Sequence, residues 1–322
     1  MTGAARMEIM RLTCARLDCR GVVGVFLSLA SLVSVAQIPT KGGQAPGTSS
    51  ISENPPVSAA TTSIESDLRH DLKAHPDSAP TLYKLGLVLR QENKPKESLE
   101  TYTQAAHLEK PDAEQLRSVA MDYVLLDDYD DAVHWLEVAL SLDPKNADVL
   151  YSLGRCLYSQ SKYADAEAMF QRVLAVKPDH LKAEENLGLI YDYANQPDKA
   201  EVALRKAAEW AGPGSKDEWP FLDLGGFLLD HDRAAEAVPF LKRAAGIAQT
   251  CTACHEKLGR ALVATGDANG GVKELEIAAK LDPKNPKMHF QLGLAYRAAG
   301  AVEKSRAEFA LSQSLYGEHS RE

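Results

Sequence analysis

The residues with the clearest chemical potential form a short motif, Cys251-Thr252-Ala253-Cys254-His255. Two cysteines three apart, followed at once by histidine, are the attachment pattern of c-type haem: both thiols bond to the haem and the histidine ligates the iron. His289 lies 34 residues after His255 and would supply the second axial ligand. The motif therefore predicts, as one alternative, a haem-carrying electron-transfer protein.

The same residues also have simpler interpretations. His255 and His289 hold equivalent positions of a sequence repeat, described below, that takes a large side chain, so the repeat accounts for His255 without haem. Cysteines three apart can also form a local disulfide or a dithiol pair. They can equally be inert small core residues. The sequence leaves these interpretations open.

Other catalytic signatures are absent from the sequence. Segment 266–273 is rich in glycine but lacks the Gly-Lys-Ser/Thr ending of a phosphate-binding loop. The chain contains neither the HExxH of zinc proteases nor the GxSxG of a nucleophile elbow, and it has no aspartate-rich calcium loop. We therefore expect no enzymatic activity, no catalytic residue and no metal site, and no cofactor apart from the haem alternative.

Composition narrows the class of protein further. The chain has 322 residues, 45% of them apolar and 25% charged, which is typical of a folded soluble protein rather than of a disordered chain or a multi-pass membrane protein. Its 45 acidic residues outnumber its 36 Lys and Arg residues, giving a net charge of −9. Because nucleic-acid binding needs an excess of basic residues, we expect no nucleic-acid partner.

The N-terminal segment has the pattern of an export signal. Four arginines precede residue 21, and residues 21–36 are free of charge and end in Ser34-Val35-Ala36. A basic stretch, an apolar stretch and small terminal residues predict a signal peptide over 1–36, cleaved after Ala36. The alternative is an uncleaved anchor that holds the chain in the inner membrane through 21–36. We expect an exported protein, periplasmic or secreted, with a flexible linker over 37–62.

From residue 79 onward the sequence repeats with a period of 34. Each repeat has a position, called a slot here, that holds Gly or Ala. Counted from this slot, a small residue follows after twelve positions and a bulky residue after sixteen. The first slot is occupied by Gly86, Ala120, Gly154, Gly188, Gly225, Gly259 and Gly293. Apolar residues spaced three to four apart predict two helices per repeat, which approach closely at the small residues. One such hairpin cannot bury its own apolar face, so the repeats must stack.

These residues resemble the tetratricopeptide repeat (TPR) family, and the 34-residue period is the family's. The resemblance predicts an all-α fold, a right-handed α-solenoid of seven helix-turn-helix repeats: 79–112, 113–146, 147–180, 181–217, 218–251, 252–285 and 286–317. Ile64, Leu68 and Leu72 predict an N-terminal cap helix within 63–78. Three extra residues near 211–214 are expected to bend the array into four plus three repeats.

The resemblance also implies a function. In TPR proteins the first helices line a concave groove in which peptides often dock, which implies a non-enzymatic scaffold that binds a partner protein or peptide. The candidate groove residues are Arg155, Lys182, Asn186, Tyr193, Trp219, Lys257, Arg260, Lys287 and Gln291. The basic members would give the groove basic spots. A further alternative is an assembly factor that forms a homodimer through its C-terminal repeat.

Overall fold

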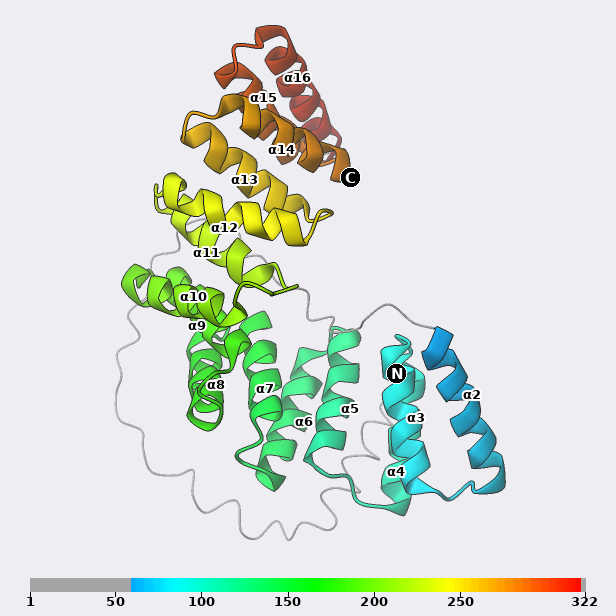
Figure 1. Cartoon of the computed structure of the whole chain (residues 1–322). Helices are drawn as coiled ribbons and strands as arrows, with labels where there is room; N and C mark the ends of the chain where they lie inside the picture. The colour runs from blue at the N-terminus through cyan, green and yellow to red at the C-terminus, as the bar shows by residue number, and fades with distance from the viewer. Residues whose placement is uncertain (1–58, 320–322) are drawn as a thin grey trace. The chain divides into compact units, whose positions relative to one another are not determined.

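The computed structural model describes residues 59–319, and there all regular structure is helical, in fifteen consecutive helices (Figure 1). This confirms the all-α repeat architecture. The chain falls into two compact units that divide between Pro178 and Asp179. The predictions for the export segment 1–36 and for most of the 37–62 linker lie outside the described residues.

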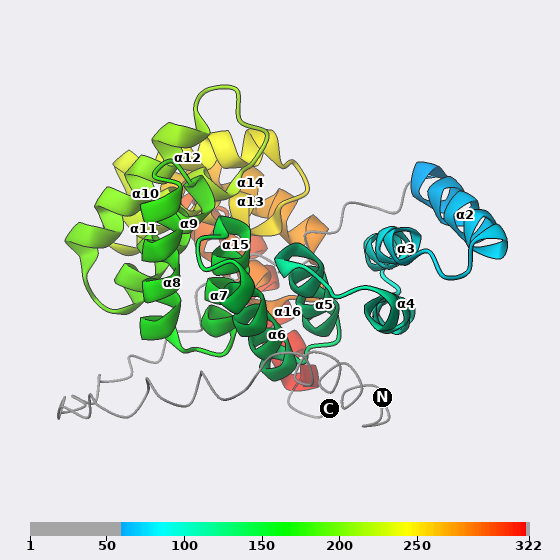
Figure 2. The same cartoon turned by 90° about the horizontal axis from the view of Figure 1, so that it is seen from below.

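Unit 1 contains a lone helix and three helical hairpins. The lone helix is α2 (Ala59–Ala74). The hairpins pair α3 (Ala79–Gln91) with α4 (Pro95–Leu108), α5 (Ala113–Leu125) with α6 (Tyr129–Leu142), and α7 (Ala147–Ser159) with α8 (Tyr163–Val176). Figure 2 shows α3 and α4 nearly end-on, with α2 beside α3.

Unit 2 contains four hairpins. They pair α9 (Leu181–Tyr193) with α10 (Pro197–Ala211), α11 (Trp219–Asp230) with α12 (Ala234–Ile247), α13 (Thr252–Ala264) with α14 (Ala268–Leu281), and α15 (Pro286–Ala298) with α16 (Val302–His319). Each second helix also packs on the first helix of the next hairpin, so the hairpins stack in chain order.

The small and bulky slots of the repeat meet inside each hairpin, as the sequence predicts. A Cβ atom added to Gly188 would lie 2.6 Å from Cγ of Leu204, sixteen residues later. The same construction on Gly154 would come within 2.7 Å of the Phe170 ring. These distances are shorter than van der Waals contact, so glycine sets how closely the two helices approach.

The turn inside every hairpin uses one residue in the left-handed region. Backbone φ is positive at the same slot of all seven repeats, at Asn93, Asp127, Ser161, Asn195, Asp232, Gly266 and Gly300. Glycine adopts this conformation without strain, and Asn and Asp tolerate it better than other residues do. Ser161, with φ of 60°, is therefore the residue least suited to its turn.

Helix α2 covers the first hairpin, in the role expected of the cap. Its Glu65 accepts from Lys94 at 2.8 Å, and its Arg69 lies 3.1 Å from Glu97. The helix begins and ends four residues earlier than the predicted 63–78 segment. It ends at Ala74 because the following residues form a turn, in which Ser78 N donates to the His75 carbonyl.

The loop over 212–218, which contains the extra residues, lies inside unit 2. Arg243 of α12 donates to the Gly212 carbonyl, and its guanidinium carbon lies 3.8 Å from the Phe221 ring centroid. These contacts hold the loop against α11 and α12. The expected arrangement of four plus three repeats is therefore wrong: the division at Pro178 leaves three repeats in unit 1 and four in unit 2.

Across residues 59–319, none of the helices combines the length and apolar composition needed to cross a membrane.

Candidate partner-binding surface

The first helices of unit 2 form one continuous layer, named here the inner row: α9, α11, α13 and α15. Each of them contacts the next along this row. In a stack of hairpins, the layer whose helices lie closer together is the inner side of the curve. Eight of the nine candidate groove residues belong to unit 2, and all eight lie on these four helices.

At the start of the inner row, Lys182 is held by two carboxylates. Its Nζ lies 2.6 Å from Asp217 Oδ2, in the 212–218 loop, and 3.1 Å from Glu185 Oε2. Burial alone would lower the pKa of Lys182, but the two carboxylates outweigh it and the pKa is raised. Lys182 is therefore a charged residue with its partners already in place.

Further along the row, three basic side chains share two carboxylates. Arg260 lies 3.4 Å from Glu256 and 3.5 Å from Asp230, and Lys287 lies 3.4 Å from Glu256. Lys257 lies 3.7 Å from Asp230. These separations exceed the roughly 2.8 Å of a charge-assisted hydrogen bond, so the contacts are loose and a ligand can replace them.

The inner row is therefore charge-compensated, and the expectation of basic spots is wrong. The residues responsible include Glu185 and Glu256, whose side chains are 5% and 3% exposed and which sequence reasoning missed. Both occupy the fifth slot of their repeats, beside the basic candidates. The available indication was their spacing, since Glu185 follows Lys182 by three residues and Glu256 precedes Arg260 by four, which places each pair on one helix face.

Next to Lys182 lies a pair of acids, the buried Glu185 and the partly buried Asp223. Burial raises the pKa of Glu185, and Lys182 opposes this. Burial and the neighbouring Glu185 raise the pKa of Asp223 well above its usual range. Because two carboxyl groups that hydrogen-bond to one another cannot both ionise, we assign the shared proton to Asp223. This end of the row therefore carries less negative charge than its residues suggest.

A cavity of about 490 Å³ opens beside Arg260. Apolar residues from five consecutive helices, α11 to α15, line it together with a few polar residues. The lining residues are Leu229, Asp232, Ala234, Arg260, Val263, Ala264, Leu275, Gln291, Leu294 and Ala295. Two sequence candidates, Arg260 and Gln291, thus lie at one opening. A preformed hollow that offers both apolar and polar contacts can accept a side chain of a partner.

Three other candidates in unit 2 have different environments. Asn186 is buried and donates to the Lys182 carbonyl at 2.7 Å, so its amide is used within its own helix. Trp219 is partly buried against the core of unit 2. Tyr193 is 47% exposed and is accessible to a partner. The Asn186 side chain is therefore a weaker candidate for partner contact than those of Arg260 and Gln291, which lie at the cavity.

Arg155, the remaining groove candidate, belongs to α7 of unit 1. Its guanidinium carbon lies 5.9 Å from the ring centroid of Tyr151 on the same helix. This is at the outer limit of a cation–π contact.

The CxxCH motif has a local structural arrangement. Cys251 and Cys254 form a disulfide, so neither sulfur is free to bond to haem. The two ring nitrogens of His255 lie 2.7 Å from Glu274 Oε2 and 3.1 Å from the Gln249 carbonyl. The haem interpretation is therefore wrong for this arrangement, because neither the thiols nor the imidazole are available.

His289 repeats the contacts of His255 one hairpin later. Its ring nitrogens lie 2.8 Å from Glu308 Oε2 and 2.8 Å from the Pro283 carbonyl. Each histidine thus joins the first helix of its hairpin to the second helix of the same hairpin and to the turn that precedes the hairpin. The expected second haem ligand is a structural residue, and the 34-residue spacing reflects the repeat.

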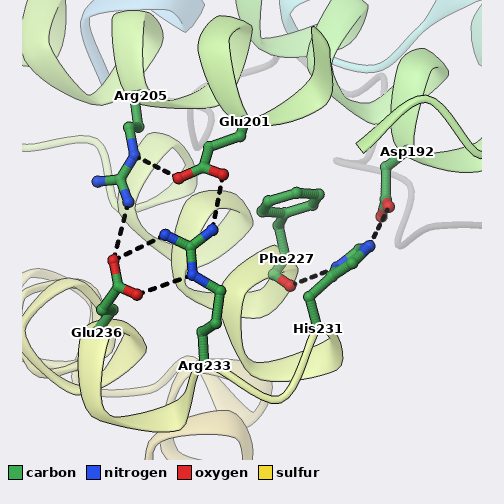
Figure 3. Close-up of polar contacts among 7 residues, drawn as sticks. All are labelled: Asp192, Glu201, Arg205, Phe227, His231, Arg233 and Glu236. Carbon is green, nitrogen blue, oxygen red and sulfur yellow. Dashed lines mark hydrogen bonds and ion pairs between the residues drawn. The ribbon is translucent and has the colours of Figure 1, made fainter. Parts of the chain in front are cut away.

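The second helices carry a different polar cluster, shown in Figure 3. Glu201 Oε2 lies 2.6 Å from Arg233, and Glu201 Oε1 lies 2.8 Å from Arg205. Glu236 contacts both arginines, which closes a ring of four charges between α10 and the start of α12. Beside it, His231 lies 3.7 Å from Asp192 and 2.9 Å from the Phe227 carbonyl. We interpret these ion pairs as contacts that stabilise the packing of the α9–α10 hairpin against the α11–α12 hairpin.

Within the described part of the chain, no three His, Cys, Asp or Glu side chains gather as a metal site would require.

Comparison with known proteins identifies the repeats. Models of the tetratricopeptide repeat match residues 124–184, 157–216 and 256–317. The chain therefore contains tetratricopeptide repeats. Among curated proteins, BBSome complex member BBS4 of Bos taurus is 22% identical over 242 residues, covering 75% of this chain and 44% of that protein. The chain spans less than half the length of the curated relatives it matches.

Solved structures agree on the fold. The pilF protein of Pseudomonas aeruginosa matches with a TM-score of 0.59 at 18% identity, over 71% of this chain and 99% of that one. YrrB, a TPR protein with an unusual peptide-binding site, matches with a TM-score of 0.50 at 18% identity, over 57% of this chain and 94% of that one. At this level of identity the likeness concerns the fold alone.

Proposed function

We propose that the chain is a non-enzymatic scaffold that binds an extended segment of a partner protein along the inner row of unit 2. The observation that carries the proposal is the cavity of about 490 Å³ lined by α11 to α15, with Arg260 and Gln291 among its lining residues. An anchoring side chain in a preformed pocket is how a small number of residues supplies most of an interface's binding energy.

The chemistry of the surface defines the segment that fits. Leu229, Val263 and Leu294 offer apolar contacts to the partner, and the volume of about 490 Å³ has room for a leucine or phenylalanine side chain together with its neighbours. Gln291 offers a donor and an acceptor to the peptide backbone. Arg260, held only by contacts of 3.4 and 3.5 Å, can turn to a carboxylate or carbonyl of the partner.

Charge compensation argues against a strongly charged partner. Lys182, Lys257, Arg260 and Lys287 of the inner row already contact carboxylates, so a polyanionic segment would have to displace these contacts. A polybasic segment would likewise compete with lysine and arginine for the same acids. We therefore propose a segment of mixed composition with an apolar anchor. The preformed helices need little ordering on binding.

A cavity-filling substitution tests this proposal. Ala264 is exposed and lines the cavity, so the indole of Ala264→Trp would occupy part of it without disturbing the buried core. Ala298, also exposed, holds the same slot one repeat later and does not line the cavity, which makes Ala298→Trp the matched control. The full chain is used to select binders from a library of displayed peptides with one apolar anchor. We expect Ala264→Trp to weaken the selected binders at least tenfold and Ala298→Trp to leave them unchanged. Equal binding by both variants would show that the cavity is not the site.

We also propose that the scaffold works outside the cytoplasm. The support is the basic and then apolar pattern of residues 1–36, which is typical of a signal peptide. Expression of the full chain in a bacterial host, followed by an intact mass, tests the proposal. A mass for 37–322 in the periplasmic fraction is expected, and full-length protein in the cytoplasmic fraction would contradict it. Full-length protein in the membrane fraction would instead indicate the uncleaved anchor.

A further inference from the structure

The disulfide between Cys251 and Cys254 has no part in the proposed function. It joins the residue that precedes α13 to the first turn of that helix. Cys254 is fully buried in the core of unit 2, whereas Cys251 is partly exposed. Cys251 packs against the edge of that core and keeps part of its surface accessible to solvent, whereas Cys254 has none.

The bond is poorly placed to act as a structural staple. A disulfide stabilises a fold mainly by closing a loop in the unfolded chain, and the effect grows with the length of the loop. Here the sequence separation is three, among the shortest loops that a disulfide can close. The surroundings are also fixed by other contacts, because His255 bonds to Glu274 and to the Gln249 carbonyl. The turn before α13 is thus held whether the bond is open or closed.

The N-terminus of α13 favours one of the two sulfurs as an anion. Cys251 is the N-cap residue, and the backbone N–H of Cys254 donates to its Sγ at 3.1 Å. Unpaired N–H groups and the helix dipole stabilise negative charge at this position. The first turn of α13 carries no acidic residue that would oppose it. A thiolate on Cys251 is therefore stabilised where the chain is accessible.

We propose that Cys251 and Cys254 form a redox-active pair that undergoes thiol–disulfide exchange with a dithiol protein. This proposal is independent of partner binding in the cavity. A thiolate of the dithiol attacks Cys251 Sγ, the bond between the two cysteines breaks, and Cys254 leaves with the electron pair and takes up a proton. The second thiol of the partner then attacks the mixed disulfide and releases Cys251. The chain gains two electrons and two protons, and the partner becomes a disulfide.

The structure predicts which cysteine forms the mixed disulfide. Cys251 is reachable and Cys254 is fully buried, so attack is directed to Cys251. Cys156 provides a negative control within the same chain. It is a free, fully buried thiol in unit 1, and burial raises the pKa of Cys156 to about 12.

The test uses the full chain with Cys14→Ser and Cys19→Ser, so that Cys156 is the only other thiol. Single variants Cys254→Ser and Cys251→Ser are treated with glutathione disulfide, and the adduct is located by peptide mass spectrometry. We expect Cys254→Ser to form an adduct on Cys251 at least about tenfold faster than Cys251→Ser forms one on Cys254. Cys156 is expected to stay unmodified. Equal rates for the two single variants would overturn the proposal.

A second measurement separates exchange from a structural role. The parent chain is reduced with a small excess of dithiothreitol under native conditions and followed by intact mass and circular dichroism. We expect a gain of two hydrogens with unchanged helicity, and a Cys251→Ser/Cys254→Ser chain that folds like its parent. Reduction only after addition of denaturant, or loss of the fold in the double variant, would show that the disulfide is a staple.

Discussion

A buried carboxyl group in unit 1 makes the stability of that unit depend on pH. Asp122 of α5 is fully buried, and its Oδ2 lies 2.6 Å from Ser98 Oγ. Ser98 Oγ also lies 2.8 Å from the Gly86 carbonyl oxygen, so two acceptors compete for one hydroxyl proton. In the last hairpin, Ser305 and Gly293 hold the positions equivalent to Ser98 and Gly86, and Ser305 donates to the Gly293 carbonyl at 2.8 Å. We infer that Ser98 donates to Gly86 in the same way, and that Asp122 is protonated and donates to Ser98.

The burial of Asp122 raises its pKa from 3.8 to about 8, against the opposing effect of Ser98. A carboxyl whose pKa is raised on folding binds a proton in the folded state that it has lost in the unfolded state. The free energy of unfolding therefore falls as pH rises between about 4 and 8, by about 1.4 kcal/mol per pH unit. From pH 5 to pH 7 this group removes about 3 kcal/mol of stability.

The variant Asp122→Asn removes this dependence and keeps the hydrogen bonds. The amide donates to Ser98 as the protonated carboxyl does. Trp135 is buried in unit 1, so its fluorescence reports unfolding of that unit in a chain carrying Trp210→Phe and Trp219→Phe. Urea unfolding at pH 5 and pH 7 should show that the chain with Asp122 loses about 3 kcal/mol more over this range than the Asp122→Asn variant does. Parallel pH profiles for the two chains would refute the reasoning, because they would mean that Asp122 does not hold a proton in the fold.

Three further changes test the packing of the repeats. Gly188→Ala should destabilise unit 2 by about 1–3 kcal/mol in urea unfolding, because the added Cβ meets Leu204. Adding Leu204→Ala to this variant should recover part of the lost stability. Full additivity of the two changes would contradict a contact between these residues. Ser161→Gly should stabilise unit 1 by about 0.5 kcal/mol, since φ is 60° there, and a lower urea midpoint would be the opposite result. Arg233 lowers the pKa of Glu201 to about 2, so the stability from this contact is present above pH 4.5 and is lost as pH falls towards 2. Arg233→Ala should therefore make the acid unfolding of unit 2 less steep. An unchanged acid transition would show that the ring of charges contributes nothing to stability.

The fold was predictable because it is encoded seven times. The Gly slot and the bulky residue sixteen positions later are in contact in hairpin after hairpin, as at Gly188 with Leu204. A single glycine in a helix would say little, but its recurrence at a fixed period identifies a position where two helices meet. The left-handed turn residues recur in the same way, at Asn93, Ser161 and Gly266 among others.

The candidate site was predicted only in part, because a repeat pattern places residues on a surface without pairing them. The sequence identified Lys182 and Arg260 as inward-facing, but each has one acidic partner on its own helix and a second one outside its repeat or helix, Asp217 and Asp230. Asp217 reaches Lys182 from an inserted loop, 35 residues away, that follows no repeat position. The cavity arises where helices of three successive hairpins meet, and no local motif indicates it. Asp122 was missed because it occupies a slot that is apolar in other repeats, such as Ile190.

Site-specific crosslinking shows whether a partner binds at the cavity of the inner row. A photoreactive amino acid is placed at Ala264, which lines the cavity, and in a second chain at Val202, which is 67% exposed on the second helix α10. Both full-length chains are irradiated together with a peptide selected for binding to the parent chain. We expect an adduct from position 264 that carries the apolar anchor of the peptide, and none from position 202. Crosslinking from position 202 in place of position 264 would contradict binding at the cavity and move the binding site to the second helices.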